Sequence, residues 1–140
     1  MAYGESGGKL PLLAGDSLDR RYDRQTDRRK KMPHFAANLT FLFTEIPFMD
    51  RFSAAKQAGF DAVEFMFPYD YNMDDIKAQL RELGLNLVLC NLPAGNWAGG
   101  DRGTAANPER KHEFREGVAK GIEAAQALGF ERMNCLVGLK

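Results

Sequence analysis

The chain has 140 residues, of which 44% are hydrophobic and 27% charged, the balance of a globular domain rather than of a disordered chain. Its net charge is zero, but residues 1–31 carry eight Lys or Arg against five Asp or Glu, and residues 32–140 carry eleven against fourteen. No apolar run approaches the ~20 residues of a membrane span, and the two cysteines lack metal-ligand spacing. We therefore expect a cytoplasmic protein with reduced thiols and no membrane partner.

Residues 1–31 are rich in Gly, Asp and Arg and show no apolar periodicity, which predicts a flexible charged N-terminal extension. The basic run at 28–31 could contact phosphate, but acidic residues are interleaved upstream and no aromatic series follows. A solvated tail is therefore favoured over a nucleic-acid-binding arm, and no nucleic-acid partner is expected. Residues 32–140 are expected to form the folded domain.

The first predicted strand is "FAANLTFLF", residues 35–43, and a helix with Phe52 on its apolar face follows it. The second predicted strand is "AVEFMF", residues 62–67, with Glu64 in its middle. A carboxylate in an apolar strand is costly unless it is paired, hydrogen-bonded or facing a polar cavity. Glu64 is therefore a candidate site residue, and a role in ordering polar groups is favoured over direct catalysis.

Three segments repeat one pattern: "AAKQAGFDAVEF" at 54–65, "QLRELGLNLVLC" at 79–90 and "AAQALGFERMNC" at 124–135. Each contains the end of a helix, a glycine that can close it in the left-handed conformation, and a short apolar strand suited to a sheet buried on both faces. Strands and helices alternating at this spacing predict an α/β fold with a parallel sheet. The sheet could be open and doubly wound or closed as a (β/α) barrel.

Two amphipathic helices are predicted in this part of the chain. The first, residues 74–83, spaces its apolar residues four and three positions apart. The second, residues 107–128, opens with Asn107 as N-cap and Pro108 at the first helical position. Its apolar stripe is expected at Phe114, Val118, Ile122 and Ala125. The final run, "MNCLVGLK" at 133–140, predicts a fourth strand.

Ligands of parallel α/β proteins meet the carboxyl ends of the strands and the loops that follow them. Asn38 and Asn91 lie within or at the end of predicted strands, and each could offer an amide to a substrate or cap a loop. The loop at 91–107 exceeds the ~12 residues beyond which loops tend to be functional or disordered. Its glycines fit no phosphate-binding motif and could simply turn a surface loop. Trp97 and Arg102 favour a lid, because an indole can shield a small acid and a guanidinium can hold its carboxylate.

The remaining reactive side chains give no catalytic pattern. His34 precedes the first strand and His112 lies on a charged helix surface, so both are expected to be solvated. Cys90 and Cys135 are expected to be small core residues, because no helix N-terminus or histidine is near either of them in sequence to lower the thiol pKa.

Four stretches, "FAANLTFLFTEIPFMDRF", "AGFDAVEFMFPYDY", "NLPAGNWAGGDRG" and "ALGFERMNCLVG", closely resemble the beginning of bacterial hydroxypyruvate isomerases, in the xylose-isomerase-like TIM-barrel superfamily. The resemblance covers Met32 to about Gly138. It implies the first four βα units of a (β/α)8 barrel, and the isomerisation of hydroxypyruvate to 2-hydroxy-3-oxopropanoate through an enediolate. A 2-oxo-tetronate isomerase, or another sugar isomerase or epimerase of the superfamily, is the alternative. An endonuclease-like phosphodiesterase is disfavoured by the acidic body of the chain and by its lack of a histidine cluster.

The resemblance also implies that the acid/base glutamates and the ligands of a divalent cation, Mg or Mn, lie on later strands beyond Lys140. No catalytic or metal-binding residue is therefore assigned within the chain, which is expected to be truncated and inactive alone. A non-catalytic half-barrel that self-associates, or that pairs with a complementing C-terminal half, is the other hypothesis. The residues carried over as substrate-binding positions are Asn38, Glu64, Tyr69, Asn91, Trp97 and Arg102.

Overall fold

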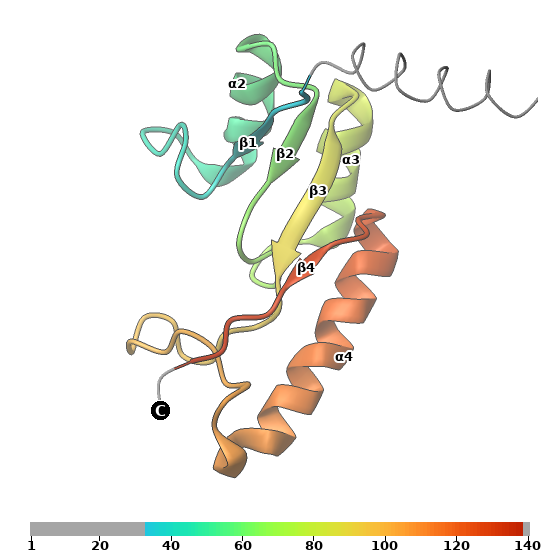
Figure 1. The fold of residues 1–140 in the computed structure, drawn as a ribbon. Helices are drawn as coiled ribbons and strands as arrows, with labels where there is room; N and C mark the ends of the chain where they lie inside the picture. The colour runs from blue at the N-terminus through green and yellow to red at the C-terminus, as the bar shows by residue number, and fades with distance from the viewer. Residues whose placement is uncertain (1–32, 139–140) are drawn as a thin grey trace, which may run out of the picture. The chain divides into compact units, whose positions relative to one another are not determined.

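The computed structural model describes residues 33–138, so the extension predicted at 1–31 lies outside the described residues. Four strands form one sheet in the order β1-β2-β3-β4, and each neighbouring pair is parallel. The elements in chain order are β1 (Ala36–Asn38), η1 (Phe48–Asp50), α2 (Arg51–Gln57), β2 (Ala62–Glu64), α3 (Met73–Leu83), β3 (Asn86–Asn91), η2 (Pro108–Arg110), α4 (Lys111–Leu128) and β4 (Met133–Asn134). The predicted alternation of strands and helices is confirmed (Figure 1).

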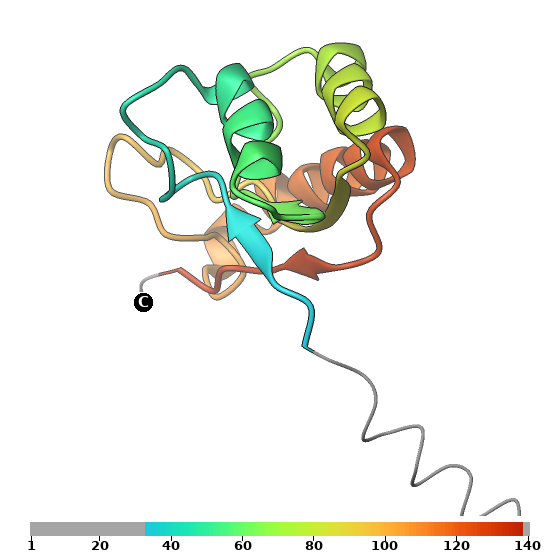
Figure 2. The ribbon, with the colours of Figure 1, turned by 90° about the horizontal axis from the view of Figure 1, so that it is seen from above.

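The three α-helices follow one another along one side of the sheet (Figures 1 and 2), with α3 packed between α2 and α4. No α-helix of residues 33–138 covers the opposite face. A doubly wound sheet carries helices on both faces, whereas the strands of a (β/α) barrel carry them only outside. The arrangement is therefore that of a barrel wall. Among these helices none is long and apolar enough to cross a membrane.

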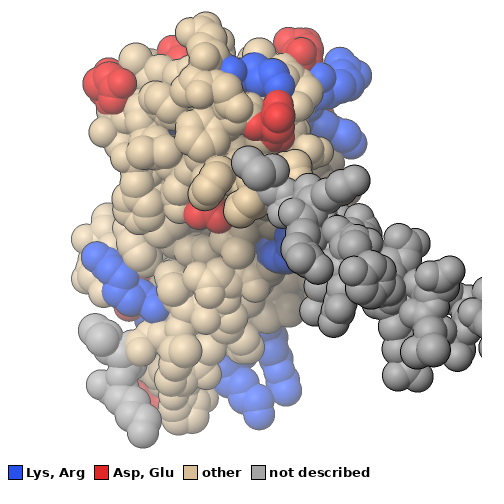
Figure 3. All heavy atoms as spheres, turned by 45° about the horizontal axis from the view of Figure 1, so that its top comes forward, with Lys and Arg blue, Asp and Glu red and all other residues tan. Residues whose placement is uncertain are grey.

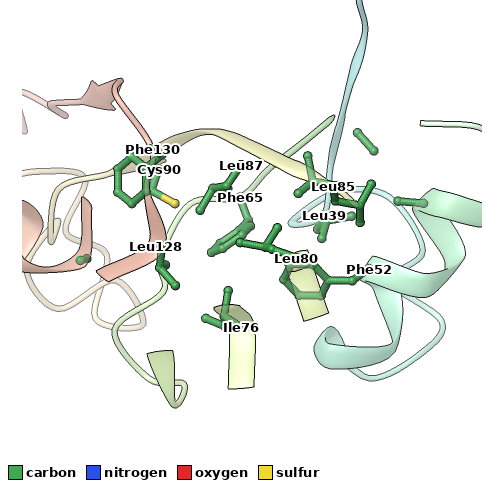
Figure 4. Packing of buried hydrophobic residues seen from close by; sticks show 14 residues of the cluster. Leu39, Phe52, Phe65, Ile76, Leu80, Leu85, Leu87, Cys90, Leu128 and Phe130 are labelled. Carbon is green, nitrogen blue, oxygen red and sulfur yellow. The ribbon is translucent and has the colours of Figure 1, made fainter. Parts of the chain in front are cut away.

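The hydrophobic core fills the space between the sheet and the helices (Figure 4). Phe52 of α2 and Phe65, just after β2, are both buried and meet edge to face with ring centroids 5.8 Å apart. Ile76 and Leu80 of α3 are buried beside them, which confirms the predicted apolar face of that helix. Burying side chains of this size stabilises the fold by about 1.5–3 kcal/mol each.

The predicted helix ends are also confirmed. Gly84 closes α3 with φ 60°, Gly129 closes α4 with φ 79°, and Gly59 follows α2 with φ 91°. These positive φ angles are accessible to glycine without the steric cost that a Cβ would add. The Asn107 side chain accepts a hydrogen bond from the Glu109 amide, as expected of an N-cap, although the first turn is the 3-10 helix η2.

The first strand is much shorter than predicted, since it ends at Asn38 and not at residue 43. The carbonyl oxygen of Asn38 accepts hydrogen bonds from the amides of Phe41 and Leu42, and its side-chain oxygen accepts one from Thr40. The chain therefore turns immediately after Asn38. Asparagine commonly competes with a strand in this way, because its side chain satisfies backbone amides locally.

The fourth strand is also shorter than predicted and consists of Met133 and Asn134. The chain then leaves β3 and pairs with the long loop, where Gly103 and Val137 form an antiparallel bridge. A Cβ on Gly103 would overlap the backbone carbonyl of Leu136, and the φ of Gly103 is 113°. This close approach requires glycine.

The apolar stripe predicted for α4 is confirmed only in part, because Phe114, Val118 and Ala125 are half-buried but Ile122 is exposed. The buried residues of this helix are Gly117, Gly121, Ala124 and Leu128, and Ile122 is 51% exposed. The helix approaches the sheet through its small residues: a Cβ on Gly121 would lie 2.6 Å from the sulfur of Met133. Small residues therefore make up most of the fully buried positions of α4.

Candidate functional site

Three of the predicted site residues are the last residues of neighbouring strands. Asn38 ends β1, Glu64 ends β2 and Asn91 ends β3. The prediction that Glu64 lies in mid-strand is therefore corrected: β2 ends at Glu64, and its register with β3 shifts between Val63 and Glu64. Parallel strands present their carboxyl ends at one edge of the sheet, which is where this fold binds ligands.

Asn38 and Glu64 are in direct contact. Asn38 Nδ2 donates a hydrogen bond of 2.8 Å to Glu64 Oε1, and both side chains are half-buried. Asn38 Oδ1 accepts from the Thr40 amide, so both ends of the Asn38 amide group are used. This hydrogen bond, at the edge of the sheet, offsets the cost of burying part of the Glu64 carboxylate in an otherwise apolar strand.

Asn91 and Tyr69 are joined by a second contact. Asn91 is buried, and its backbone oxygen accepts a 2.7 Å hydrogen bond from the Tyr69 hydroxyl. Burial, with a smaller contribution from Cys90, raises the pKa of Tyr69 to about 12. The phenol is therefore a neutral hydrogen-bond donor at physiological pH.

Asn134 is a strand-end residue that the sequence analysis missed. It ends β4, pairs with Asn91 in the sheet register and is exposed. The signal for it was its position in the run "MNCLVG", where a polar residue interrupts the predicted fourth strand. With Asn134, the last residue of every described strand is polar.

A hollow of about 190 Å³ lies between the loops that follow β2 and β3 and helix α4. Tyr69 and Trp97 are the predicted residues in its wall. The other residues that line it are Phe67, Asp70, Pro93, Ala94, Gly95 and Lys120. Asn38, Glu64, Asn91 and Arg102 do not line this hollow, so the six predicted residues do not form one pocket. Lys120 lies on the charged part of α4, where the sequence gives no sign of a site.

Arg102 is placed against Trp97. Its guanidinium carbon lies 4.0 Å from the centre of the indole ring, and Nη1 donates hydrogen bonds to the backbone oxygens of Trp97 and Asp101. The indole also contacts Phe67, with ring centroids 5.2 Å apart. These contacts make Arg102 a group that shapes the loop, and its binding of a substrate carboxylate stays a prediction.

A chain of ion pairs ties the same loop to α4. Asp101 accepts a 2.7 Å contact from Arg110, whose guanidinium also contacts both carboxylate oxygens of Glu113. The Arg110 guanidinium, followed by the Asn96 amide, holds the pKa of Asp101 below its usual range, and Arg110 likewise lowers the pKa of Glu113. The loop is therefore fastened by charged groups at neutral pH.

The remaining titratable groups agree only in part with the predictions. His34 and His112 are exposed, as predicted. Cys90 is buried, and burial raises the pKa of its thiol to about 12, as expected of a core residue. Cys135 is exposed, which corrects the prediction that it belongs to the core, because the chain has already left the sheet at this point.

A divalent cation does not fit the described residues. Mg²⁺ and Mn²⁺ prefer clusters of carboxylate and other oxygen ligands, with histidine as a further ligand for Mn²⁺. Residues 33–138 contain no group of three or more His, Cys, Asp or Glu side chains arranged to hold such an ion. No step of the chemistry below is therefore assigned to a metal.

The face of the molecule seen in Figure 3 carries charged side chains of both signs in small, separate groups. Uncharged residues make up most of this face, and neither sign forms a continuous patch on it. A phosphate backbone is bound by clustered Lys and Arg, so the described residues visible on this face form no site of that kind.

Parallel βα units with all helices on one side, polar residues at the strand ends and a hollow between the following loops define the wall of a TIM-barrel protein. Residues 52–140 match the family model described as "Xylose isomerase-like TIM barrel". The chain belongs to this family, which confirms the superfamily recognised in the sequence.

Curated relatives add detail within the family. The chain is 53% identical over 107 residues to "Hydroxypyruvate isomerase" of Escherichia coli (strain K12), covering 76% of the chain and 42% of the relative. It is 49% identical over 105 residues to "2-oxo-tetronate isomerase" of Haemophilus influenzae, covering 75% of the chain and 41% of that relative. The chain therefore spans about two fifths of the length of these relatives.

A solved structure shows the same arrangement. "Crystal structure of AP endonuclease, family 2 from Brucella melitensis" matches with a TM-score of 0.75 at 46% identity, covering 76% of this chain and 42% of that chain. The likeness supports the barrel-wall architecture derived from the sheet and helices.

Proposed function

We propose that the chain is part of an isomerase that converts hydroxypyruvate to 2-hydroxy-3-oxopropanoate in the cytoplasm. The observation that carries this proposal is the 53% identity to the E. coli hydroxypyruvate isomerase, which extends over 107 residues, 76% of the chain. The polar pair at the ends of β1 and β2 supports it, because it presents an amide and a carboxylate where this fold binds substrates.

The reaction moves a proton from the hydroxymethyl carbon to the neighbouring carbonyl carbon, and a second proton between the two oxygens, through an enediolate. It requires a base, an acid and hydrogen bonds to the developing oxyanion. We assign binding roles to the described residues: Glu64 and Asn38 to the substrate hydroxyl and carbonyl groups, and Trp97 and Tyr69 to the shielding wall. Asn91 positions Tyr69, and Arg102 is assigned to the substrate carboxylate.

The acid/base glutamates, and any Mg or Mn ion, are proposed to come from the part of the relatives' length that this chain does not match. The 140-residue chain alone is then expected to bind the acid without turning it over. A complementing C-terminal half would restore the reaction.

A 2-oxo-tetronate isomerase is the nearest alternative, supported by relatives at 44–49% identity. The two reactions share the proton transfer and differ in the substrate, since a tetronate has one carbon more than hydroxypyruvate. Substrate preference therefore separates the two proposals.

A chimera tests both. The 107-residue segment of the E. coli hydroxypyruvate isomerase that aligns with this chain is replaced by the corresponding residues of this chain. We expect the chimera to isomerise hydroxypyruvate with a higher kcat/KM than 2-oxo-tetronate. The reverse preference would support the alternative, and a folded chimera without activity on either substrate would contradict the proposal.

A non-catalytic role through association is the second candidate function. Within the described residues β1 pairs only with β2 and β4 only with β3, which leaves two strand edges open. Phe35 beside β1 and Val137 beyond β4 are 74% and 61% exposed. Open edges and exposed apolar side chains favour self-association or a partner. Light scattering on the purified chain tests this role, because a stable monomer over a range of concentrations would contradict it.

A further inference from the structure

We propose that Arg110 is a positioning residue that holds Trp97 in the wall of the hollow by fixing Asp101. The proposal adds a function to a residue outside the hollow and outside the set predicted from the sequence. It concerns the same edge of the sheet as the proposed function, but its test does not depend on turnover.

Asp101 is connected directly to the segment that carries Trp97. Asp101 Oδ2 accepts a 2.6 Å hydrogen bond from the Asn96 amide, and the Asp101 amide donates to the Asn96 oxygen at 3.0 Å. Asn96 and Asp101 are thus joined by two hydrogen bonds, which close the 96–101 segment, including Trp97, into a tight turn. An ionised carboxylate makes the stronger hydrogen bond to a backbone amide, so the charge of Asp101 contributes directly.

Arg110 in turn holds the Asp101 carboxylate in place. Arg110 Nη2 lies 2.7 Å from Asp101 Oδ2, and the same guanidinium is oriented by two 2.7 Å contacts to Glu113. Glu113 belongs to α4, the longest helix of the described chain. A planar guanidinium held on two sides has a fixed geometry that an ammonium group does not reproduce. Arg110 therefore transmits the rigidity of α4 to the loop.

Gly95, which lines the hollow, is packed tightly against the ion pair. A Cβ on Gly95 would lie 2.7 Å from Arg110 Nη2 and would overlap the Asp101 carboxylate. The ion pair thus lies directly against the Gly95 backbone, which lines the hollow. Displacing the pair would free this backbone and the indole two residues later.

The contacts of the indole show what holds Trp97 within the loop. Trp97 contacts Phe67 at its edge and the Arg102 guanidinium over its ring, and its backbone oxygen accepts from Arg102 and from the Gly100 amide. All but the Phe67 contact come from within the loop. They keep the indole in the loop. The loop is joined to the rest of the domain by the Gly103–Val137 bridge, by the packing of Trp97 on Phe67 and, next to the segment that carries Trp97, by the contact of Asp101 with Arg110.

The test uses Trp97 fluorescence in the 140-residue chain, which contains one tryptophan. We expect Arg110→Gln and Asp101→Asn each to raise the acrylamide quenching constant about twofold, because an indole in a locally opened loop is quenched like an exposed one. The double variant should show no more than either single variant, since both remove one interaction. Arg110→Lys should restore only part of the wild-type protection.

Lys56→Gln is the matched control, because it removes a surface ion pair of 2.8 Å between Lys56 and Asp61, neither of which belongs to the loop that carries Trp97. It should leave Trp97 quenching unchanged. If Arg110→Gln lowers the helicity measured by circular dichroism, Asp101→Asn decides, because it leaves α4 intact. Wild-type quenching in Asp101→Asn, or additive effects in the double variant, would overturn the proposal.

Discussion

The hydrogen bond between Asn38 and Glu64 should be measurable as a coupling energy in a double-mutant cycle. The perturbations are Asn38→Ala, Glu64→Ala and the combination of the two. A hydrogen bond to a charged group contributes about 1.5–3 kcal/mol when it is well buried. Both side chains are only half-buried, so solvent screening lowers the expected coupling to about 1 kcal/mol.

The single variants should differ in cost. Asn38→Ala also removes the bond from the Thr40 amide, so its free energy of unfolding should fall by about 2 kcal/mol, against about 1 kcal/mol for Glu64→Ala. Urea unfolding followed by circular dichroism gives all four values. Glu82, an exposed residue near the end of α3, serves as the control partner, and its Ala variant should be additive with Asn38→Ala. A coupling below about 0.3 kcal/mol between Asn38 and Glu64 would refute the reasoning.

Three further predictions concern the loop, the cysteines and the phenol. Gly103→Ala should destabilise the chain by about 1–3 kcal/mol more than Gly100→Ala in urea unfolding, because both have positive φ but only Gly103 approaches another backbone segment; equal costs would contradict this. Exposed Cys135 should react with a thiol reagent at least about 100-fold faster than buried Cys90, as followed by peptide mass spectrometry; similar rates would disprove the assigned burial. Burial raises the pKa of Tyr69 from 10.0 to about 12, so between these values the unfolded state loses its proton first and stability should fall as pH rises; Tyr69→Phe should reduce this slope, and an unchanged slope would argue against the assignment.

The order of the elements could be predicted because it depends on local sequence. The repeated glycine and apolar strand mark each helix end, and Gly84 and Gly129 adopt the left-handed conformation that the pattern requires. The lengths of β1 and β4 could not be predicted in the same way. They depend on where Asn38 bonds to the following turn and on the pairing of Val137 with Gly103, which is distant in sequence.

The candidate site could likewise be predicted only where its residues are marked by local sequence. Glu64 could be singled out from its cost in an apolar strand, but its partner Asn38 lies 26 residues away and only the sheet brings the two together. Lys120 could not be found, because a lysine on a charged helix is usually solvated. The most buried positions of α4 could not be predicted, because Gly117 and Gly121 are buried through close packing and carry no apolar side chain that would mark them in the sequence.

The central claim is that the strand-end residues of this chain belong to the substrate site of an isomerase. The most direct measurement is the kcat/KM for hydroxypyruvate of the chimera with the E. coli relative, compared with its Glu64→Gln and Asn38→Ala variants. Removal of one preorganised polar contact to the reacting groups should lower kcat/KM by at least about tenfold. Variants that fold and isomerise hydroxypyruvate as efficiently as the unmodified chimera would contradict the account.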